Sequence, residues 1–244
     1  MVDVDLLLRG FPGWSSNFGR LGWPSLPLLR ADGKNVLVDA GHHGVMEWLL
    51  PALAQRGLAP DDIDMVLLSH THWDQCLGLP HFPNAEIVVG RREMDWAMSL
   101  GPGEDTAVPY LLVHWLAQHP RLRTLQGDAE LLPGVLMIDT PGHTPGHMSV
   151  IATTDRGKVA LAQDALKYRS EYVALTADMS MNPAASAASI QKIAALADQV
   201  FPGHDRPFRI EGGRTVYMEE LKAEFVAKVG PTLEEETVFS IVFR

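Results

Sequence analysis

The amino-acid sequence predicts an α/β sandwich, in which two β-sheets pack face to face and helices cover their outer sides. Short apolar runs typical of strands occur in two groups along the chain, and helical patterns follow each group. Hydrophobic residues make up 46% of the 244 residues and charged residues 20%, which is typical of a globular protein. Because no internal repeat, low-complexity tract or flexible linker divides the sequence, we expect a single domain over residues 1–244.

The first group of predicted strands lies in the N-terminal half of the chain. The sequence Ala31-Asp32-Gly33-Lys34 is typical of a turn and predicts a hairpin. The continuous apolar run at 65–69 is typical of a strand that is covered on both faces. Strands are expected at 4–8, 26–30, 36–39, 65–69 and 85–89. Helical spacing of apolar residues predicts helices at 45–55, 92–100 and 110–118.

The second group of predicted strands follows residue 120. Strands are expected at 122–125, 135–139, 148–153, 158–162 and 238–243, and the apolar Val200 leads into Phe201-Pro202-Gly203-His204. An alanine-rich helix is expected at 184–196, because Asn182-Pro183 is a typical start signal. The spacing of apolar residues also predicts a last amphipathic helix at 216–229.

Charge and cysteine content exclude several classes of partner. The 30 acidic and 20 basic residues give a formal charge of −10, and such a surface repels phosphate backbones, so we expect no nucleic-acid partner. No apolar run is long enough to span a bilayer, so we expect no membrane association. The single cysteine, Cys76, rules out an internal disulfide and predicts a reducing compartment, which we take to be the cytoplasm.

A cluster of histidines and an aspartate follows the predicted buried strand at 65–69. The sequence there reads His70-Thr71-His72-Trp73-Asp74, and residues two apart on extended backbone point to the same side. His70, His72 and Asp74 can therefore converge on one ion, and imidazole with carboxylate suits Zn²⁺. Taken alone, the cluster is equally compatible with ordinary loop histidines at a strand end.

Three later residues strengthen the prediction of a metal site. His143 follows the predicted strand at 135–139, Asp164 follows the strand at 158–162, and His204 lies in the sequence Phe201-Pro202-Gly203-His204. Open strand ends are places where a sandwich can bring together ligands from distant positions. The sequence therefore predicts a bound Zn²⁺, with iron or manganese as alternatives.

Together these pieces resemble the metallo-β-lactamase superfamily over nearly the whole chain. They are Val38-Asp39-Ala40-Gly41, the motif at 70–74, His143, Asp164 and His204, and they occur in the family order. The resemblance implies an αββα sandwich with its metal site at one edge of the sheets.

The resemblance also implies which residues hold metal. By position, His70, His72 and His143 would bind a first ion, and Asp164 would bridge it to a second. The bound ion would lower the pKa of a water molecule toward about 7, so that hydroxide becomes available to attack a carbonyl carbon.

The second ion would belong to Asp74 and His204, but the sequence departs from the family pattern beside them. Gln75 stands where that pattern normally ends in a histidine. Because a neutral amide oxygen is a poorer ligand for Zn²⁺ than an imidazole, we expect the second site to be weakened, empty or filled by a harder ion. Alternatively, Gln75 reaches the metal or hydrogen-bonds its water. Asp74 is also a candidate catalytic residue that orients the attacking water or carries a proton to the leaving oxygen.

Within the superfamily, the sequence is most similar to the N-acyl homoserine lactonase-like branch. The segments that carry this likeness are 72–74, 82–85, 90–93, 196–198 and 201–205. Members of that branch open lactone rings, and a tyrosine after the bridging aspartate helps to bind the lactone carbonyl. Tyr168 is the candidate here, although its spacing from Asp164 is one residue too long. Tyr168 as a plain wall residue, and Lys167 as an electrophile or carboxylate anchor, are the alternatives.

A glycine-containing loop at 11–23 carries four aromatic residues, namely Phe11, Trp14, Phe18 and Trp23. By family position this loop would overhang the metal, where aromatic side chains suit an apolar acyl chain. The alternative is a hydrophobic cover or a subunit contact. This loop and the predicted helix at 216–229 suggest a homodimer, by analogy alone.

Several other side chains have simpler interpretations. The tryptophans and methionines in predicted helices are expected to be core residues: Trp48, Met94, Trp96, Met98 and Trp115. Cys76 is expected to be a packed small side chain rather than a ligand. His147 is a candidate to tune His143 through a hydrogen bond.

Three functions remain open at this stage. The first is a metal-dependent hydrolase of a small-molecule carboxylic ester, such as a lactone. The second is a thioester hydrolase or a mononuclear iron dioxygenase of the persulfide type, in which His70, His143 and Asp164 would form the face that binds Fe(II). The third is a non-catalytic metal-binding sensor of the same fold, and Gln75 is its only support.

Overall fold

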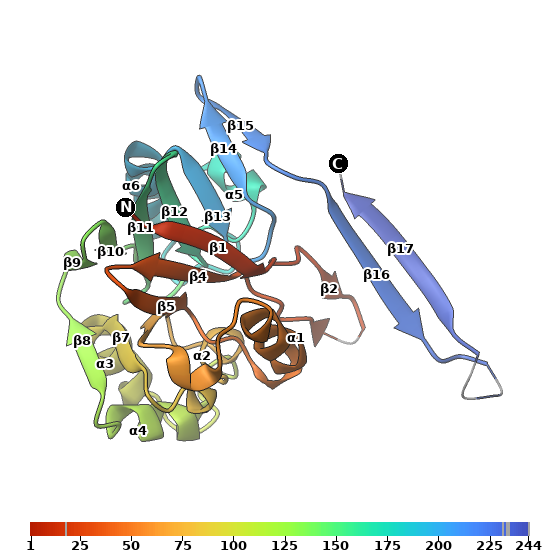
Figure 1. Cartoon of the computed structure of the whole chain (residues 1–244), viewed down its shortest axis with the longest axis horizontal. Coiled ribbons are helices and arrows are strands. Elements are labelled where there is room, and N and C mark those ends of the chain that lie inside the picture. The colour runs from red at the N-terminus through yellow and green to blue at the C-terminus, as the bar shows by residue number, and fades with distance from the viewer. Residues whose placement is uncertain (18, 231, 233–234, 244) are drawn as a thin grey trace.

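Two β-sheets form the inner layers of the protein and helices cover their outer faces (Figure 1). The computed structural model describes residues 1–17, 19–230, 232 and 235–243. The arrangement confirms the predicted αββα sandwich. Within the described ranges, no helix combines the length and the apolar character needed to span a membrane.

The first sheet holds the N-terminal strands. Strands β1, β4 and β5 are antiparallel neighbours, and β5 to β8 are parallel. In spatial order the strands are β1 (Asp3–Leu8), β4 (Leu26–Ala31), β5 (Lys34–Val38), β6 (Met65–Leu68), β7 (Glu86–Gly90) and β8 (Leu122–Leu125). The helices on this side are α1 (His43–Ala54), α3 (Arg91–Ser99) and α4 (Tyr110–Ala117), and the short α2 (Trp73–Cys76) follows β6 in the chain.

The second sheet holds the later strands. All of its neighbours are antiparallel except β12 and β13, which are parallel. In spatial order the strands are β15 (Arg214–Tyr217), β14 (Phe208–Glu211), β13 (Gln199–Pro202), β12 (Gly157–Gln163), β11 (Met148–Thr154), β10 (Val135–Asp139) and β9 (Ala129–Leu132). Helix α6 (Pro183–Leu196) contacts β12, and α5 (Arg169–Ala174) precedes it in the chain.

The central core lies between the two sheets. Leu67 and Val88 of the first sheet pack in one cluster with Met137, Val150 and Leu161 of the second, and all five are essentially inaccessible to solvent. Complete burial of such side chains contributes about 1.5–3 kcal/mol each, so this cluster holds the sheets in a fixed relation. The ends of the strands that contribute to this cluster are therefore fixed relative to one another.

A β-hairpin at the C-terminus projects from the body of the molecule (Figure 1). It consists of β16 (Leu221–Ala227) and β17 (Thr237–Phe243), so the predicted helix at 216–229 is wrong. Met218, Leu221, Phe225 and Val229 do lie at helical spacing, but the alternation of less and more exposed residues along β16 has period two. The pairing with β17 decides between the two patterns. The helix-based argument for a homodimer therefore fails.

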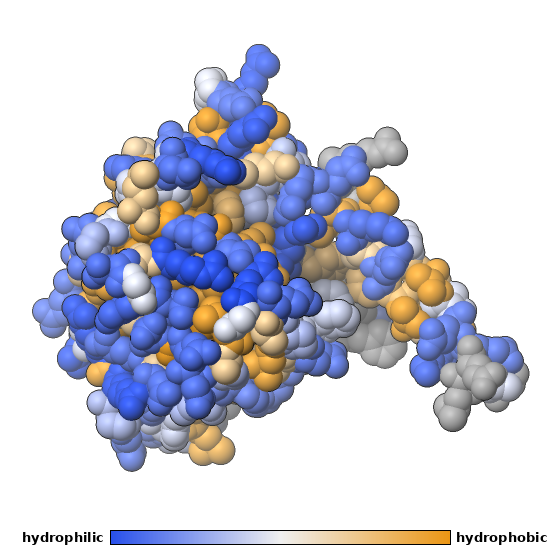
Figure 2. Space-filling model, viewed as in Figure 1, coloured by the Kyte–Doolittle hydropathy of each residue, from blue (hydrophilic) through white to orange (hydrophobic). Residues whose placement is uncertain are grey.

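Exposed apolar side chains lie along this hairpin, as Figure 2 shows. They include Val226, Val238, Ile241 and Val242. Three residues expected in the core are also exposed, because they point outward from their helices: Trp48 of α1, Met98 of α3 and Trp115 of α4. Met94, by contrast, is buried as expected, and Trp96 packs partly buried against the first-sheet core.

Candidate metal centre

Three histidines from two strand ends meet at one edge of the sandwich. His70 and His72 follow β6, and the main-chain bond from Met148 N to Ser69 O holds this strand end against β11 at 2.9 Å. His143 lies in the loop between β10 and β11. One ring nitrogen of each histidine lies within 4.8 Å of the others. The structure thus brings together all three residues predicted for the first ion.

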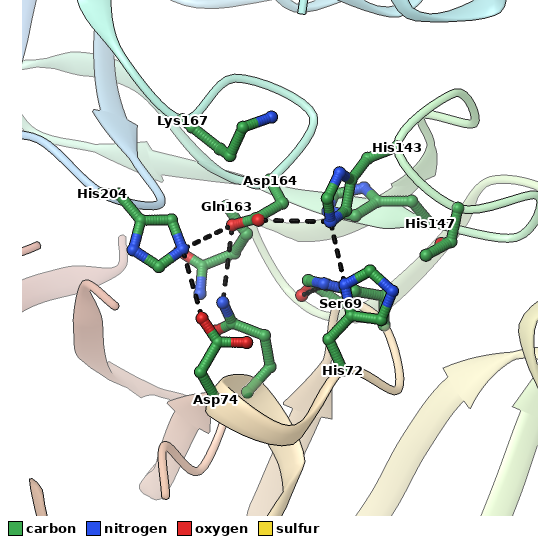
Figure 3. A network of polar contacts seen from close by, with 12 residues as sticks. Ser69, His72, Asp74, His143, His147, Gln163, Asp164, Lys167 and His204 are labelled. Atoms are coloured by element: carbon green, nitrogen blue, oxygen red, sulfur yellow. Dashed lines mark hydrogen bonds and ion pairs between the residues drawn. The ribbon is translucent and has the colours of Figure 1, made fainter. Parts of the chain in front are cut away.

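The histidine cluster fits a metal ion on two grounds. Nε2 of His70 is buried and has no hydrogen-bond partner among the described residues. Nε2 of His143 lies 3.0 Å from Nδ1 of His72, so two ring nitrogens face each other directly (Figure 3). Burial lowers the pKa of His70 and of His143 well below the usual range, so both rings are neutral at pH 7 and offer lone pairs. Three neutral imidazoles suit Zn²⁺.

Asp164 connects the histidine cluster to a second group of polar side chains. One carboxylate oxygen, Oδ2, lies 3.3 Å from His143 Nε2. The other, Oδ1, lies 3.3 Å from His204 Nε2 and accepts a hydrogen bond from Gln75 Nε2 at 3.4 Å. Figure 3 shows the carboxylate between the two groups. A carboxylate in this place is able to bind on both sides, as a bridging ligand requires.

The second group contains Asp74, Gln75 and His204. His204 Nε2 lies 3.4 Å from Asp74 Oδ2, and its Nδ1–H donates to the main-chain oxygen of Trp23 at 3.1 Å. Burial disfavours the charged form of His204, but Asp164 and Asp74 together outweigh it and raise its pKa to about 9. Burial raises the pKa of Asp74 to about 6, against the opposite effect of His204. His204 Nε2 therefore lies between two carboxylates, in a place whose negative charge favours a cation.

Gln75 occupies the position where the sequence departs from the family pattern. Its side chain is fully buried, and its Oε1 has no hydrogen-bond partner within the described part of the chain. Its Nε2 points to Asp164, as the hydrogen bond at 3.4 Å requires. The amide therefore lies within the second group, as the sequence predicts for a residue that replaces a histidine there.

Hydrogen bonds behind His70 set the orientation of its ring. Asp39 accepts bonds from Ser69 N at 2.7 Å, from Ser69 Oγ at 2.8 Å and from the amide of Gln163. Ser69 Oγ also lies 2.9 Å from His70 Nδ1. When Asp39 is ionised, the Ser69 hydroxyl donates to it, so Nδ1–H of His70 donates to Ser69. Nε2 of His70 then presents its lone pair to the cluster.

A buried glutamate joins the two loops that carry the histidines. Glu93 Oε1 accepts bonds from Thr71 N and Thr71 Oγ1, each at 2.9 Å. Its Oε2 accepts from Thr144 Oγ1 at 2.6 Å and from Gly146 N at 3.2 Å. No pattern in the sequence predicted a supporting role for Glu93, Ser69 or Gln163. The one available signal was an acid on the apolar side of the predicted helix at 92–100.

Tyr168 and Lys167 both line the small cavity over the metal centre. Tyr168 is half-buried, and burial raises its pKa to about 12. Lys167 is almost completely buried, and its Nζ donates to the main-chain oxygen of Asp178 at 2.6 Å and lies 3.2 Å from Glu171. Both alternatives for the carbonyl-binding group are thus present at the cavity wall.

His147 does not contact His143 in the way that the sequence analysis expected. Its Nδ1 lies 2.9 Å from Thr140 Oγ1, and its ring lies 5.1 Å from that of His70. Cys76 is buried and its Sγ donates to Thr71 O at 3.5 Å, so it is a packed side chain as expected. Burial raises the pKa of this thiol well above its usual value.

The aromatic loop packs against the C-terminal hairpin. Phe11 and Trp23 contact each other at 5.4 Å between ring centroids, and Phe225 of β16 stacks on Trp23 at 5.9 Å. This contact favours the alternative of a hydrophobic cover. Phe18 lies outside the described residues, and Trp14 lies in the short hairpin of β2 (Trp14–Ser15) and β3 (Gly19–Arg20).

Comparison with known proteins places the fold and the centre in context. A model of the metallo-beta-lactamase superfamily matches residues 28–227. An N-acyl homoserine lactonase of Bacillus thuringiensis is 28% identical over 158 residues, which cover 63% of this chain but only 60% of that protein. Metallo-beta-lactamase domain-containing protein 1 of Mus musculus is 30% identical over 225 residues, which cover 87% and 77%. Among solved structures, AidC, a dizinc quorum-quenching lactonase in complex with a product, matches with a TM-score of 0.66 and 19% identity, over 80% of this chain and 78% of AidC.

Proposed function

Because the chain belongs to the metallo-beta-lactamase superfamily, we propose that it is a metal-dependent hydrolase that opens a lactone ring in a small molecule. The observation that carries the proposal is the position of Asp164, whose two oxygens face His143 and His204 at 3.3 Å each. This carboxylate joins a three-histidine cluster to a second group of ligand-type side chains. Such a layout supports hydrolysis rather than simple ion storage.

The ligand assignment follows this layout. His70, His72 and His143 would hold the first ion, which we propose to be Zn²⁺, and Asp164 would bridge to a second. Asp74 and His204 would hold the second, beside Gln75. When bound, the ion lowers the pKa of a water molecule toward about 7 and polarises a carbonyl oxygen.

The protein's own side chains supply the proton transfer, the hydrogen bonds to the substrate and the positioning of the histidines. Asp74 lies beside His204 and is placed to orient water and to carry its proton to the leaving alkoxide. Lys167 at the cavity wall is placed to donate to a carbonyl or carboxylate oxygen. Tyr168 shares that wall, and its phenol, whose pKa burial raises to about 12, is a hydrogen-bond donor there. Asp39 and Glu93 hold the histidine loops in position.

Lactones are the proposed substrate class because of the relatives' activity. The matching Bacillus thuringiensis protein is an N-acyl homoserine lactonase, and AidC binds a ring-opened product. Since the chain spans only 60% of that lactonase, its substrate is our proposal.

The test is a ring-opening assay on the zinc-loaded protein with N-hexanoyl homoserine lactone, followed by titration of the acid released. We expect hydrolysis that disappears in Asp164→Asn, a substitution that keeps the side-chain shape but removes the bridging charge. Hydrolysis of thioesters alone, or of no ester by fully loaded protein, would contradict the proposal.

A second candidate function follows from the buried Gln75. If the second group holds no ion, a single Fe(II) on His70, His143 and Asp164 would serve a persulfide-type dioxygenase. Elemental analysis together with oxygen consumption separates the candidates. One iron per chain and oxygen uptake with a persulfide substrate would favour the dioxygenase, whereas zinc without oxygen uptake would favour the hydrolase.

A further inference from the structure

The cavity directly over the metal centre is too small to hold a whole substrate. Its volume is about 80 Å³, whereas ligand pockets in proteins usually measure about 300–1,000 Å³. It therefore accommodates the reacting ester group and little else. The remainder of the substrate must lie in a neighbouring space.

The neighbouring space is a second pocket of about 630 Å³. Arg20, Tyr168 and Met179 line both cavities, so the two adjoin along these side chains. A substrate whose carbonyl is at the metal centre would extend past Tyr168 into the larger pocket. The charge and polarity of the side chains that line that pocket therefore indicate the chemical class of the rest of the substrate.

Three arginines and two aspartates line the larger pocket, which we call the arginine pocket, so that positive formal charges outnumber negative ones. The charged residues are Arg20, Arg169, Arg206, Asp178 and Asp205, and Tyr168, Ser170 and Tyr217 lie beside them. The guanidinium carbons of Arg206 and Arg169 lie 3.7 and 4.0 Å from the centre of the Tyr217 ring. Two like charges are thus held close together on one aromatic side chain. Arg206 is only 3% exposed, in a chain whose formal charge is −10.

The carboxylate of Asp205 supports the geometry of the pocket. Asp205 accepts hydrogen bonds from the main-chain N–H of Arg206 at 2.8 Å and of Arg169 at 3.2 Å. It also accepts from the Tyr217 hydroxyl at 2.7 Å. These bonds fix the backbone of both arginines and the ring on which they stack. The side chains are therefore preorganised, which reduces the entropy lost when an anion binds.

We propose that the arginine pocket binds an oxyanion, a carboxylate or a phosphate, at the end of the substrate remote from the ester. This inference rests on the proposed function and narrows its substrate to an anionic lactone or ester. Guanidinium groups match the geometry of carboxylate and phosphate through paired N–H donors. A neutral acyl chain in the same place would desolvate the arginines without compensation. Lys167 lines only the smaller cavity and its Nζ lies 3.2 Å from Glu171, so the anion would rely on the arginines.

A binding experiment tests the pocket independently of catalysis. Titration calorimetry with glutarate, with inorganic phosphate and with neutral pentanamide would be run on the wild type, on Arg169→Gln and on Arg209→Gln. Arg209 is the control, because it is exposed and pairs with Glu211 on β14. We expect one of the two anions to bind, and Arg169→Gln to weaken it about tenfold or more. Which anion binds identifies the group; binding of neither, or equal weakening in Arg209→Gln, would overturn the inference.

A kinetic experiment extends the test to substrate choice. N-glutaryl and N-pentanoyl homoserine lactones have acyl chains of equal length that differ in the terminal carboxylate. We expect the wild type to prefer the glutaryl compound, and Arg169→Gln to remove the preference through KM with little change in kcat. Hydrolysis of both lactones without preference would overturn this inference and leave the proposed function standing. Anion binding in a protein that opens neither lactone would overturn the proposed function and leave the anion site standing.

Discussion

Oδ1 of Asp164 and Nε2 of His204 lie 3.3 Å apart, although two helices and a strand, α5, α6 and β13, separate the two residues in the sequence. The contact exists because β12 and β13 are parallel neighbours whose ends lie at the same edge of the sheet. Gly203 permits it, since a Cβ atom there would lie 2.4 Å from that same carboxylate oxygen. The relationship between the two residues is therefore built into the sheet.

The first prediction concerns the three-histidine cluster. His143→Ala removes the ring that faces both His72 and Asp164, so the first ion loses one of three neutral nitrogen ligands. We expect the purified variant to lose its tightly bound metal and nearly all hydrolysis. Elemental analysis and the ring-opening assay measure both effects. His114→Ala, on an outer helix, is the control, and metal content equal to the wild type in His143→Ala would contradict the assignment.

Gln75 provides the second prediction. Gln75→His restores an imidazole where the amide now contacts Asp164, so we expect the occupancy of the second site, and with it the metal content per chain, to rise. Gln75→Asn, which leaves an amide but shortens it, should not raise the content. If Gln75→His binds the same number of metal ions per chain as the wild type, Gln75 does not weaken the second site.

A third prediction tests the support of His70. Ser69→Ala removes the hydroxyl that lies between Asp39 and His70 Nδ1. Outer hydrogen-bond partners of metal ligands typically contribute about 10–100-fold in affinity, so we expect Zn²⁺ to bind that much more weakly. Competition with a chromogenic chelator measures the change. Ser99→Ala on the exposed end of α3 is the matched control, and equal zinc affinity in Ser69→Ala and wild type would refute the role.

The residues that we propose as metal ligands could be singled out in the sequence because each belongs to a short local pattern. His70 and His72 share one side of an extended segment, and His143, Asp164 and His204 all follow strands. Their supports could not be predicted. Glu93 and Gln163 act on residues far away in the chain, and nothing local distinguishes a buried acid or amide from a surface one.

The predictions of secondary structure were likewise correct where the pattern is local and wrong where it depends on pairing with another strand. Strands β8 and β10 were predicted with the observed boundaries, because turn-forming residues bound each of them. The apolar run of β10 is continuous, whereas in β8 two leucines flank Arg123 and Thr124. The segment at 216–229 was misassigned because its apolar residues satisfy both periodicities, and only pairing with β17 distinguishes them. The strand pair β14–β15 was missed, although Phe208 and Ile210 alternate with polar residues and Gly212-Gly213 joins the two strands.

The last prediction concerns the pH dependence of stability. Arg56 donates two hydrogen bonds to Asp5, one of them at 2.8 Å from Nη2 to Oδ1. These bonds, against the smaller opposing effect of burial, lower the pKa of Asp5 below its usual value of 3.8. The unfolded chain therefore binds this proton more readily than the folded one. The stabilisation is fully present above about pH 4 and is lost as the pH falls through the lowered pKa.

Removal of the arginine should show this pattern directly. At pH 7 we expect Arg56→Met to lower the free energy of unfolding by about 0.2–1 kcal/mol, because the pair is partly exposed to solvent. The difference from wild type should narrow as the pH falls below about 4, and urea unfolding at a series of pH values measures it. In an Asp5→Asn background the same substitution should have an effect that does not change with pH. A difference that stays constant from pH 7 to pH 3 in the Asp5 protein would show that Arg56 acts through packing rather than through this carboxylate.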